Sequence, residues 1–227
     1  MKTLIANWKM NVGIRESVAL ARGTLLTLRG RKVIPELVIC PPFVALSEVR
    51  KIVARSSVFL GAQNVFWEPA GAHTGEISTR MLQEVGVSHV ILGHSERRQE
   101  LYETDEMIHE KVRHVLSEQM TPIVCIGESK QQREAGNTQE VVGAQLVSAL
   151  SQIHLRAQER VFIAYEPLWA IGTGIASSVA EVTEVHRFIR AVLEEQFPGM
   201  SSSFSLLYGG SVDGENAYGF LREEIID

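Results

Sequence analysis

The chain has 227 residues, of which 45% are hydrophobic and 22% are charged, as is typical of a globular domain with a sizeable core. Its formal net charge of -5 argues against nucleic acid or an anionic membrane surface as the main partner. No apolar run reaches membrane-spanning length, and the opening stretch, residues 1–6, is too short for the core of a signal peptide.

Short apolar runs alternate with longer amphipathic segments along the chain, with no linker or low-complexity segment between them. The runs predict strands at residues 4–6, 37–40, 58–62, 89–92, 123–126, 161–164 and 204–208. The amphipathic segments predict helices that include residues 18–28, 44–54, 105–118, 179–195 and about 213–223.

Strict alternation of strands and helices predicts parallel strands with helices outside them, in one domain that spans residues 1–227. Because the strand runs are continuously apolar, both faces of each strand are expected to be covered. A closed (β/α)8 barrel and an open doubly wound sheet both fit this pattern. The lack of a Gly-x-Gly-x-x-Gly motif after the first strand weakens the dinucleotide-binding form of the open sheet.

Polar residues favour the barrel, because they follow five of the predicted strands at their C-terminal ends, where barrel enzymes build their sites. These residues are Asn7, Lys9, Gln63, Asn64, His94, Glu96, Glu166 and Ser211. Seven strands are predicted and not eight, so the expected fold is an α/β (β/α)8 barrel whose final βα unit is missing.

The two cysteines, Cys40 and Cys125, each lie within one of the apolar runs. This position favours buried thiols over a disulfide and predicts a reducing, cytoplasmic location. Neither cysteine has a ligand-like partner at zinc spacing, and the histidines are scattered. We therefore expect neither a metal site nor a cofactor.

Glu166 directly follows a predicted strand and precedes a segment with a proline at one end, two glycines at the other and an apolar middle. Rigid ends around an apolar tip suit a loop that closes over a ligand, so we predict a lid. The lid residues are Pro167, Leu168, Trp169, Ala170, Ile171, Gly172, Thr173 and Gly174. A helix is expected to begin after Ser178, which forms a capping box with Glu181. The alternative is an ordinary loop whose glutamate faces water.

Three further residues have side chains or neighbours suited to chemistry. Lys9 could hold an anion, although a solvated lysine is the alternative. His94 lies next to a predicted helix start, which favours a neutral imidazole that donates a hydrogen bond, although it could be a structural histidine. The glycines before Ser211 could let backbone amides approach an oxyanion, or simply form a turn. Together with Glu166, these groups suit proton abstraction next to a carbonyl in a small phosphorylated substrate.

Four motifs, in this order and spacing, closely resemble those of the triosephosphate isomerase family. They are Asn-Trp-Lys-Met-Asn at 7–11, Gly-His-Ser-Glu-Arg-Arg at 93–98, Tyr-Glu-Pro-Leu-Trp-Ala-Ile-Gly-Thr-Gly at 165–174 and Tyr-Gly-Gly-Ser at 208–211. The resemblance implies a barrel that interconverts dihydroxyacetone phosphate and glyceraldehyde 3-phosphate through an enediolate, in glycolysis and gluconeogenesis. The alternative is a catalytically impaired, truncated or phosphate-binding relative.

The resemblance also implies a role for each matching residue. The roles are a proton-shuttling base for Glu166, a neutral electrophile for His94, substrate contacts for Lys9 and Asn7, phosphate contacts for Gly172 and Ser211, and support behind these groups for Ser95, Glu96 and Cys125. The family's long interface loop matches residues 63–76, which implies a homodimer. In that pattern Thr74 approaches the strand-one site of the neighbouring subunit, and Glu76 pairs with the arginine that matches Arg97. Phe66, Trp67 and Pro69 in this loop would otherwise form an exposed apolar patch.

Overall fold

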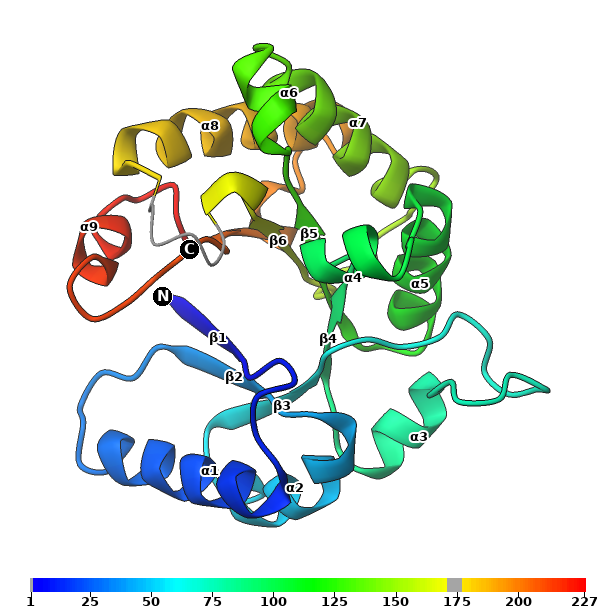
Figure 1. Cartoon of the computed structure of the whole chain (residues 1–227), viewed down its shortest axis with the longest axis vertical. Helices are drawn as coiled ribbons and strands as arrows, with labels where there is room; N and C mark the ends of the chain where they lie inside the picture. Colours follow the sequence, from blue (N-terminus) through cyan, green and yellow to red (C-terminus); the bar gives the residue numbers. More distant parts are fainter. Residues whose placement is uncertain (1, 171–176) are drawn as a thin grey trace. The chain divides into compact units, whose positions relative to one another are not determined.

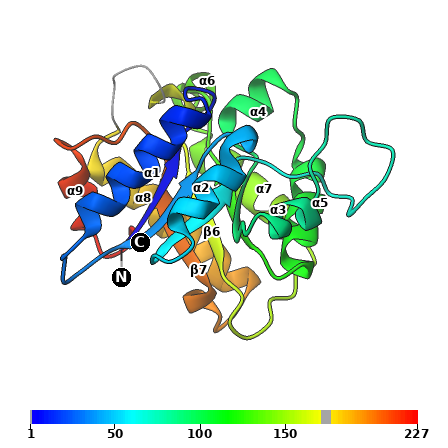
Figure 2. The same ribbon diagram turned by 90° about the horizontal axis from the view of Figure 1, so that it is seen from below.

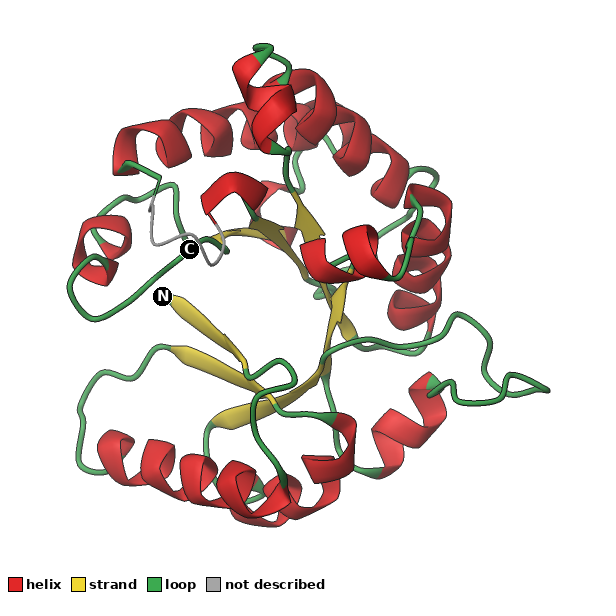
Figure 3. Cartoon of the chain, viewed as in Figure 1, coloured by secondary structure: helices red, strands yellow, loops and turns green. Residues whose placement is uncertain are grey.

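All seven predicted strands are present, at or near their predicted bounds. The computed structural model describes residues 2–170 and 177–227. The strands are β1 (Thr3–Asn7), β2 (Glu36–Cys40), β3 (Val58–Ala62), β4 (His89–Leu92), β5 (Thr121–Ile126), β6 (Val161–Tyr165) and β7 (Phe204–Tyr208). Figure 3 shows how these strands alternate with helices along the chain.

Several of the α-helices were not among the segments that the sequence patterns singled out. The helices are α1 (Ile14–Leu28), α2 (Leu46–Val53), α3 (Thr79–Glu84), α4 (Ser95–Glu100), α5 (Asp105–Ser117), α6 (Lys130–Glu134), α7 (Thr138–Leu150), α8 (Val179–Gln196) and α9 (Ala217–Leu221). Three 3-10 turns accompany them, η1 (Phe43–Ala45), η2 (Leu168–Ala170) and η3 (Ser201–Ser203).

Contacts divide the chain into two units, residues 1–92 with 114–121, and residues 93–113 with 122–227. In the first unit, strands β1 to β4 follow one another in chain order, and the described pairs are parallel. Helices α1 and α2 lie side by side, and α2 packs on β3 (Figures 1 and 2). The expectation that both faces of each strand are covered is wrong for β1 and β3, because Leu4 and Phe59 are each 42% exposed. Within its unit, β1 is an edge strand.

The second unit contains the parallel strands β5, β6 and β7, with β6 in the middle. Every residue of β6 is buried, as its continuous run of apolar residues predicts. The register places Cys125 of β5 opposite Ala164 of β6, and Tyr165 opposite Tyr208 of β7. The C-terminal ends of these strands therefore lie next to one another, which is the edge from which the candidate site is built.

Local hydrogen bonds explain where two helices begin. The predicted capping box is confirmed at α8, where Glu181 N donates to Ser178 Oγ and Ser178 N donates to Glu181 Oε2. The last helix is shorter than predicted, because Asp213 Oδ1 accepts the backbone N–H groups of Glu215 and Asn216. These bonds form a turn that competes with helix, so α9 begins at Ala217.

A buried histidine in α8 predicts acid sensitivity. His186 is fully buried, and its Nδ1 bonds to the carbonyl of Val182 at 2.9 Å. Burial lowers the pKa of His186 to about 4, whereas an unfolded histidine titrates near 6.5. Between these values the unfolded chain binds a proton that the folded chain excludes. Stability therefore falls as the pH drops from about 6.5 to 4, by about 3 kcal/mol in all.

Urea unfolding at several pH values measures this effect. We expect His186→Leu to unfold with a weaker pH dependence than the parent between about pH 6.5 and 4. The matched control is His154→Leu, because His154 is exposed and should leave the dependence unchanged. An equal pH dependence in the parent and His186→Leu would contradict the prediction.

Candidate active site

The centre of the candidate site is a carboxylate and an imidazole brought together at the ends of two strands. Glu166 follows β6, and its N–H donates to the carbonyl of Ile126 at 2.7 Å, which extends the β5–β6 pairing. His94 follows β4 and caps α4. Its Nε2 lies 3.5 Å from Glu166 Oε1, and both side chains are less than 10% exposed. The carboxylate of Glu166 is oriented by a hydrogen bond from Ser95 N to Oε2 at 3.1 Å.

Hydrogen bonding defines the tautomer of His94. Its Nδ1 accepts the backbone N–H of Glu96 at 3.3 Å, so this nitrogen carries no proton. In the neutral ring the proton is then on Nε2, the atom that faces Glu166. The sequence predicted that a helix start beside His94 would favour a neutral donor; the helix start is present, and the neutral state stays a prediction. Backbone amides rather than side chains of Ser95 and Glu96 make these two contacts.

Two glycines leave room for Glu166. A Cβ atom on Gly127 would lie 1.9 Å from the carbonyl oxygen of Glu166, and one on Gly209 would lie 2.7 Å from its Cγ. Any side chain at either position would therefore displace the carboxylate. Gly209 N donates to the carbonyl of Tyr165 at 2.8 Å, which continues the β6–β7 pairing by one residue. These contacts hold Glu166 between β5 and β7.

Glu128 is a second buried carboxylate that sequence reasoning missed. It is fully buried, both its oxygens accept the Tyr165 hydroxyl at 3.1 Å, and Oε1 accepts Trp169 Nε1 at 3.0 Å. Burial and this carboxylate raise the pKa of Tyr165 well above its usual range. Glu166 was predicted because it is a carboxylate just beyond a strand. The same criterion also applies to Glu128, which lies two residues after β5.

The described part of the predicted lid is hydrogen-bonded to the side chain and the backbone of Glu128. Residues 168–170 form η2, and Leu168 N donates to the carbonyl of Glu128 at 3.1 Å. The guanidinium of Arg133 lies 4.3 Å from the centre of the Trp169 ring and also pairs with Glu181. Ser211, a predicted phosphate contact, donates from Oγ to the carbonyl of Ala170 at 2.7 Å. Lid residues 171–174, which include Gly172, lie outside the described residues.

In the other unit, the loop after β1 holds Lys9 in an uncommon backbone conformation. The φ angle of Lys9 is +51°, and its N–H donates to Asn7 Oδ1 at 3.0 Å. Gln63, which follows β3, donates from Nε2 to the carbonyl oxygens of Lys9 at 3.0 Å and Cys40 at 2.9 Å. The predicted site residues Asn7, Lys9 and Gln63 are thus joined by hydrogen bonds.

The predicted interface loop has a more compact apolar part than the sequence suggests. The rings of Phe66 and Trp67 stack 4.1 Å apart, and His73 lies 4.5 Å from Phe66. Phe66, Trp67 and Pro69 are half-buried in the single chain, so each keeps some exposed surface. Thr74 and Glu76 are exposed.

Both cysteines are buried and free, as predicted. The carbonyl of Cys125 accepts Arg98 Nη2 at 3.3 Å, and Arg97 Nε lies 2.6 Å from Glu103 Oε1 of the same chain. Within residues 2–170 and 177–227, no group of three or more histidine, cysteine or acidic side chains could hold a metal ion. Over the same residues, no helix is both long and apolar enough to cross a bilayer.

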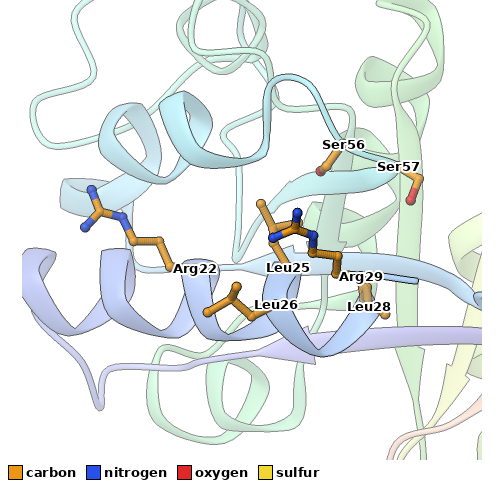
Figure 4. Close-up of a pocket in the computed structure, with 7 residues that line it drawn as sticks. All are labelled: Arg22, Leu25, Leu26, Leu28, Arg29, Ser56 and Ser57. Atoms are coloured by element: carbon orange, nitrogen blue, oxygen red, sulfur yellow. The ribbon is translucent and has the colours of Figure 1, made fainter. Parts of the chain in front are cut away.

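A surface groove of about 530 Å³ has walls from the C-terminal half of α1 and the turn before β3 (Figure 4). It is lined by Arg22, Leu25, Leu26, Leu28, Arg29, Ser56 and Ser57. None of the predicted site residues lines this groove, so it is not part of the candidate site.

The whole described sequence matches one protein family. The model of the triosephosphate isomerase family matches residues 2–227. The triosephosphate isomerase of Alkaliphilus oremlandii is 44% identical over 228 residues, which cover 100% of this chain and 91% of that protein. Those of Idiomarina loihiensis and Aquifex aeolicus are 44% and 43% identical, and cover 99% and 100% of this chain and 88% and 92% of those proteins.

Parallel strands that alternate with helices, and a carboxylate–imidazole pair at the strand ends, define an α/β barrel enzyme. With the relatives above, the class is that of the isomerases. The chain belongs to the triosephosphate isomerase family, and its fold class is the (β/α)8 barrel of that family. The resemblance inferred from the four sequence motifs is thereby confirmed.

Proposed function

We infer that the chain interconverts dihydroxyacetone phosphate and glyceraldehyde 3-phosphate through an enediolate, as a step of glycolysis and gluconeogenesis. The observation that carries this inference is the 3.5 Å approach of His94 Nε2 to Glu166 Oε1 in a chain of this family. A carboxylate and a neutral imidazole N–H at one point can act together on a C–H bond and the carbonyl beside it. No metal or other cofactor enters the proposed reaction.

In the proposed reaction Glu166 removes a proton from the carbon next to the carbonyl of the substrate. The electrons of that C–H bond form the double bond of the enediolate, and His94 Nε2–H donates to the oxygen on which negative charge develops. Glu166 then returns the proton to the neighbouring carbon, while the hydroxyl proton on the first carbon passes to the oxygen of the former carbonyl beside His94. The first carbon now carries the carbonyl and the second the hydroxyl, which converts the ketose into the aldose. A glutamate base and a neutral histidine electrophile are the roles already known for this family.

The remaining predicted residues take supporting roles in this proposal. Lys9 and Asn7 contact the substrate, and the positive charge of Lys9 offsets the charge of the enediolate. Gly172 and Ser211 contact the phosphate, the former as the lid of residues 167–174 closes. Ser95, Glu96 and Cys125 hold the catalytic groups from behind. The backbone bonds to Glu166 and His94 support this role for Ser95 and Glu96.

A coupled assay with glyceraldehyde 3-phosphate tests the proposed activity. We expect the purified chain to convert this substrate, and the rate to depend on Glu166. A catalytically impaired or purely phosphate-binding relative would bind the substrate or its phosphate without turnover. Saturable binding with no turnover would therefore overturn the proposal.

We further propose a homodimer that forms through residues 63–76, a single barrel domain over residues 1–227, and a cytoplasmic location. One family match over residues 2–227 supports the single domain, and two buried free thiols support a reducing compartment. The side chain of Met10, 96% exposed beside Lys9, and the half-buried pair of Phe66 and Trp67 support a partner surface.

The dimer predicts the effect of polar substitutions in the loop. Burial of Phe66 and Trp67 against a partner is worth roughly 1.5–3 kcal/mol for each side chain. The double variant Phe66→Ser with Trp67→Ser should therefore shift sedimentation toward a monomer and lower activity. Val33→Ser, at an exposed residue of another loop, is the control and should leave association unchanged. A parent chain that sediments as a monomer at micromolar concentration would contradict the dimer.

A further inference from the structure

We propose that Gln63 is a positioning residue that holds the backbone of Lys9 in the conformation required for its role in the reaction. The proposal rests on the proposed function, in which Lys9 contacts the substrate. The sequence placed Gln63 among the polar residues after the predicted strands and at the start of the predicted interface loop, but assigned it no part in the reaction.

The backbone of Lys9 needs an external restraint. Its φ angle of +51° lies in the left-handed region, which is disfavoured for residues with a Cβ atom. Asn and Asp tolerate this region better, because their short side chains bond locally, whereas lysine has no such bond to offer. Such a conformation persists only where surrounding contacts determine it.

Gln63 supplies that restraint from another strand. Its Nε2 donates to the carbonyl of Lys9 at 3.0 Å and to the carbonyl of Cys40 at 2.9 Å, so both amide hydrogens are used. Cys40 O also accepts Trp8 N at 3.1 Å, which carries the β1–β2 pairing one residue beyond Asn7. One side-chain amide thus ties the loop after β1 to the end of β2.

The chemistry of the restraint is specific to a neutral amide. A leucine at position 63 has a similar volume but no donor, and an ionised glutamate has only acceptors. Either substitution removes the Gln63 donor from the carbonyls of Lys9 and Cys40, although Cys40 O keeps the N–H of Trp8. The strength of two such bonds is of the same order as the cost of the left-handed conformation. Their loss should let Lys9 relax into the ordinary region of φ, which misplaces its side chain without unfolding the chain.

A double-mutant cycle on activity tests whether Gln63 acts through Lys9. The cycle compares the parent, Gln63→Leu, Lys9→Ala and the double variant in the coupled assay. We expect Gln63→Leu to lower kcat/KM by about 5–30-fold in the parent, and by less than about twofold when Lys9 is already alanine. Equal losses in both backgrounds would show a structural effect and overturn the proposal.

Two variants keep this test interpretable. Gln63→Glu removes the donors at constant length and should act in the same direction as Gln63→Leu, which covers the case that leucine prevents folding. Gln83→Leu is the matched control, because Gln83 Nε2 also donates to a carbonyl, that of Glu118 at 2.8 Å, but Gln83 has no part in the proposed reaction. The control should leave kcat/KM within about twofold of the parent.

A second readout does not depend on activity and separates failure of this proposal from failure of the proposed function. The backbone chemical shifts of Lys9 report whether its φ is positive. We expect the left-handed signature in the parent and in Gln83→Leu, and its loss in Gln63→Leu and Gln63→Glu. If Lys9 keeps this signature in both Gln63 variants, the positioning role is overturned. If the signature is lost but Lys9→Ala retains full activity, the proposed role of Lys9 in the reaction is wrong. Gln63 would then hold the backbone of Lys9 without any effect on catalysis.

Discussion

Replacement of Glu166 by glutamine is expected to lower kcat by about 10²–10⁴-fold with little change in KM. The amide keeps the shape of the side chain and can still accept the Ser95 N–H through its oxygen, but it cannot take a proton from carbon. Because the interaction that is lost belongs to the transition state, the loss should appear in kcat and not in substrate affinity. The coupled assay, run over a range of substrate concentrations, measures both constants.

The matched control is Glu134→Gln in α6, which removes an exposed carboxylate that pairs only loosely with Lys130 at 3.9 Å. This variant should keep the activity of the parent, because exposed ion pairs contribute little and Glu134 has no place in the proposed reaction. A Glu166→Gln variant whose kcat stays within about threefold of the parent would exclude Glu166 as the base.

Replacement of Glu128 by alanine is expected to destabilise the chain by about 3–5 kcal/mol, a large part of the stability of a typical domain. Glu128 is fully buried and accepts hydrogen bonds from Tyr165 and Trp169, and Arg133 lies 3.7 Å from its Oε1. Without the carboxylate, the buried hydroxyl of Tyr165, the half-buried Trp169 Nε1–H and a nearby guanidinium lose an acceptor. An unsatisfied buried group costs about 1–3 kcal/mol. Urea unfolding measures the loss.

The same substitution should lower turnover even under conditions in which the chain remains folded. Tyr165 directly precedes Glu166, and Trp169 belongs to the predicted lid, so Glu128 connects the base to the lid through two hydrogen bonds. Glu128→Gln, which keeps one acceptor oxygen, should show an intermediate effect on stability. Glu140→Ala in α7, at an exposed position, is the control and should change stability by less than about 0.5 kcal/mol. A Glu128→Ala variant as stable as this control would contradict the prediction.

Local patterns in the sequence determined the order of strands and helices. The runs at 58–62, 89–92 and 204–208 are strands with the predicted bounds, because short, mostly apolar runs rich in β-branched or aromatic residues suit a strand. The start of α8 was predictable for a similar reason, since its capping box joins residues only three apart. The four motifs that carry the family resemblance are also short and local, so the order of the residues is enough to identify them.

Tertiary structure decided which of the polar residues form a site. Glu166 is oriented by the backbone of Ser95, 71 residues earlier, and Gln63 reaches the carbonyl of Lys9 across 54 residues. Neither contact has a periodic pattern in the sequence. They depend on close approach of strand ends, which at Glu166 requires that Gly127 and Gly209 have no side chain.

Glu128 and Lys9 also show which features the sequence predicts and which depend on the tertiary structure. The sequence places a glutamate two residues after a strand, but its burial among Tyr165, Trp169 and Arg133 arises only when β5, β6 and α6 pack together. The sequence likewise places a lysine after the first strand, whereas its left-handed φ and its bond to the amide of Gln63 are features of the folded chain. Periodicity and capping act over a few residues, so the sequence alone determined the elements. Burial, tautomer and backbone strain depend on groups far apart in the chain, and only the folded structure decided them.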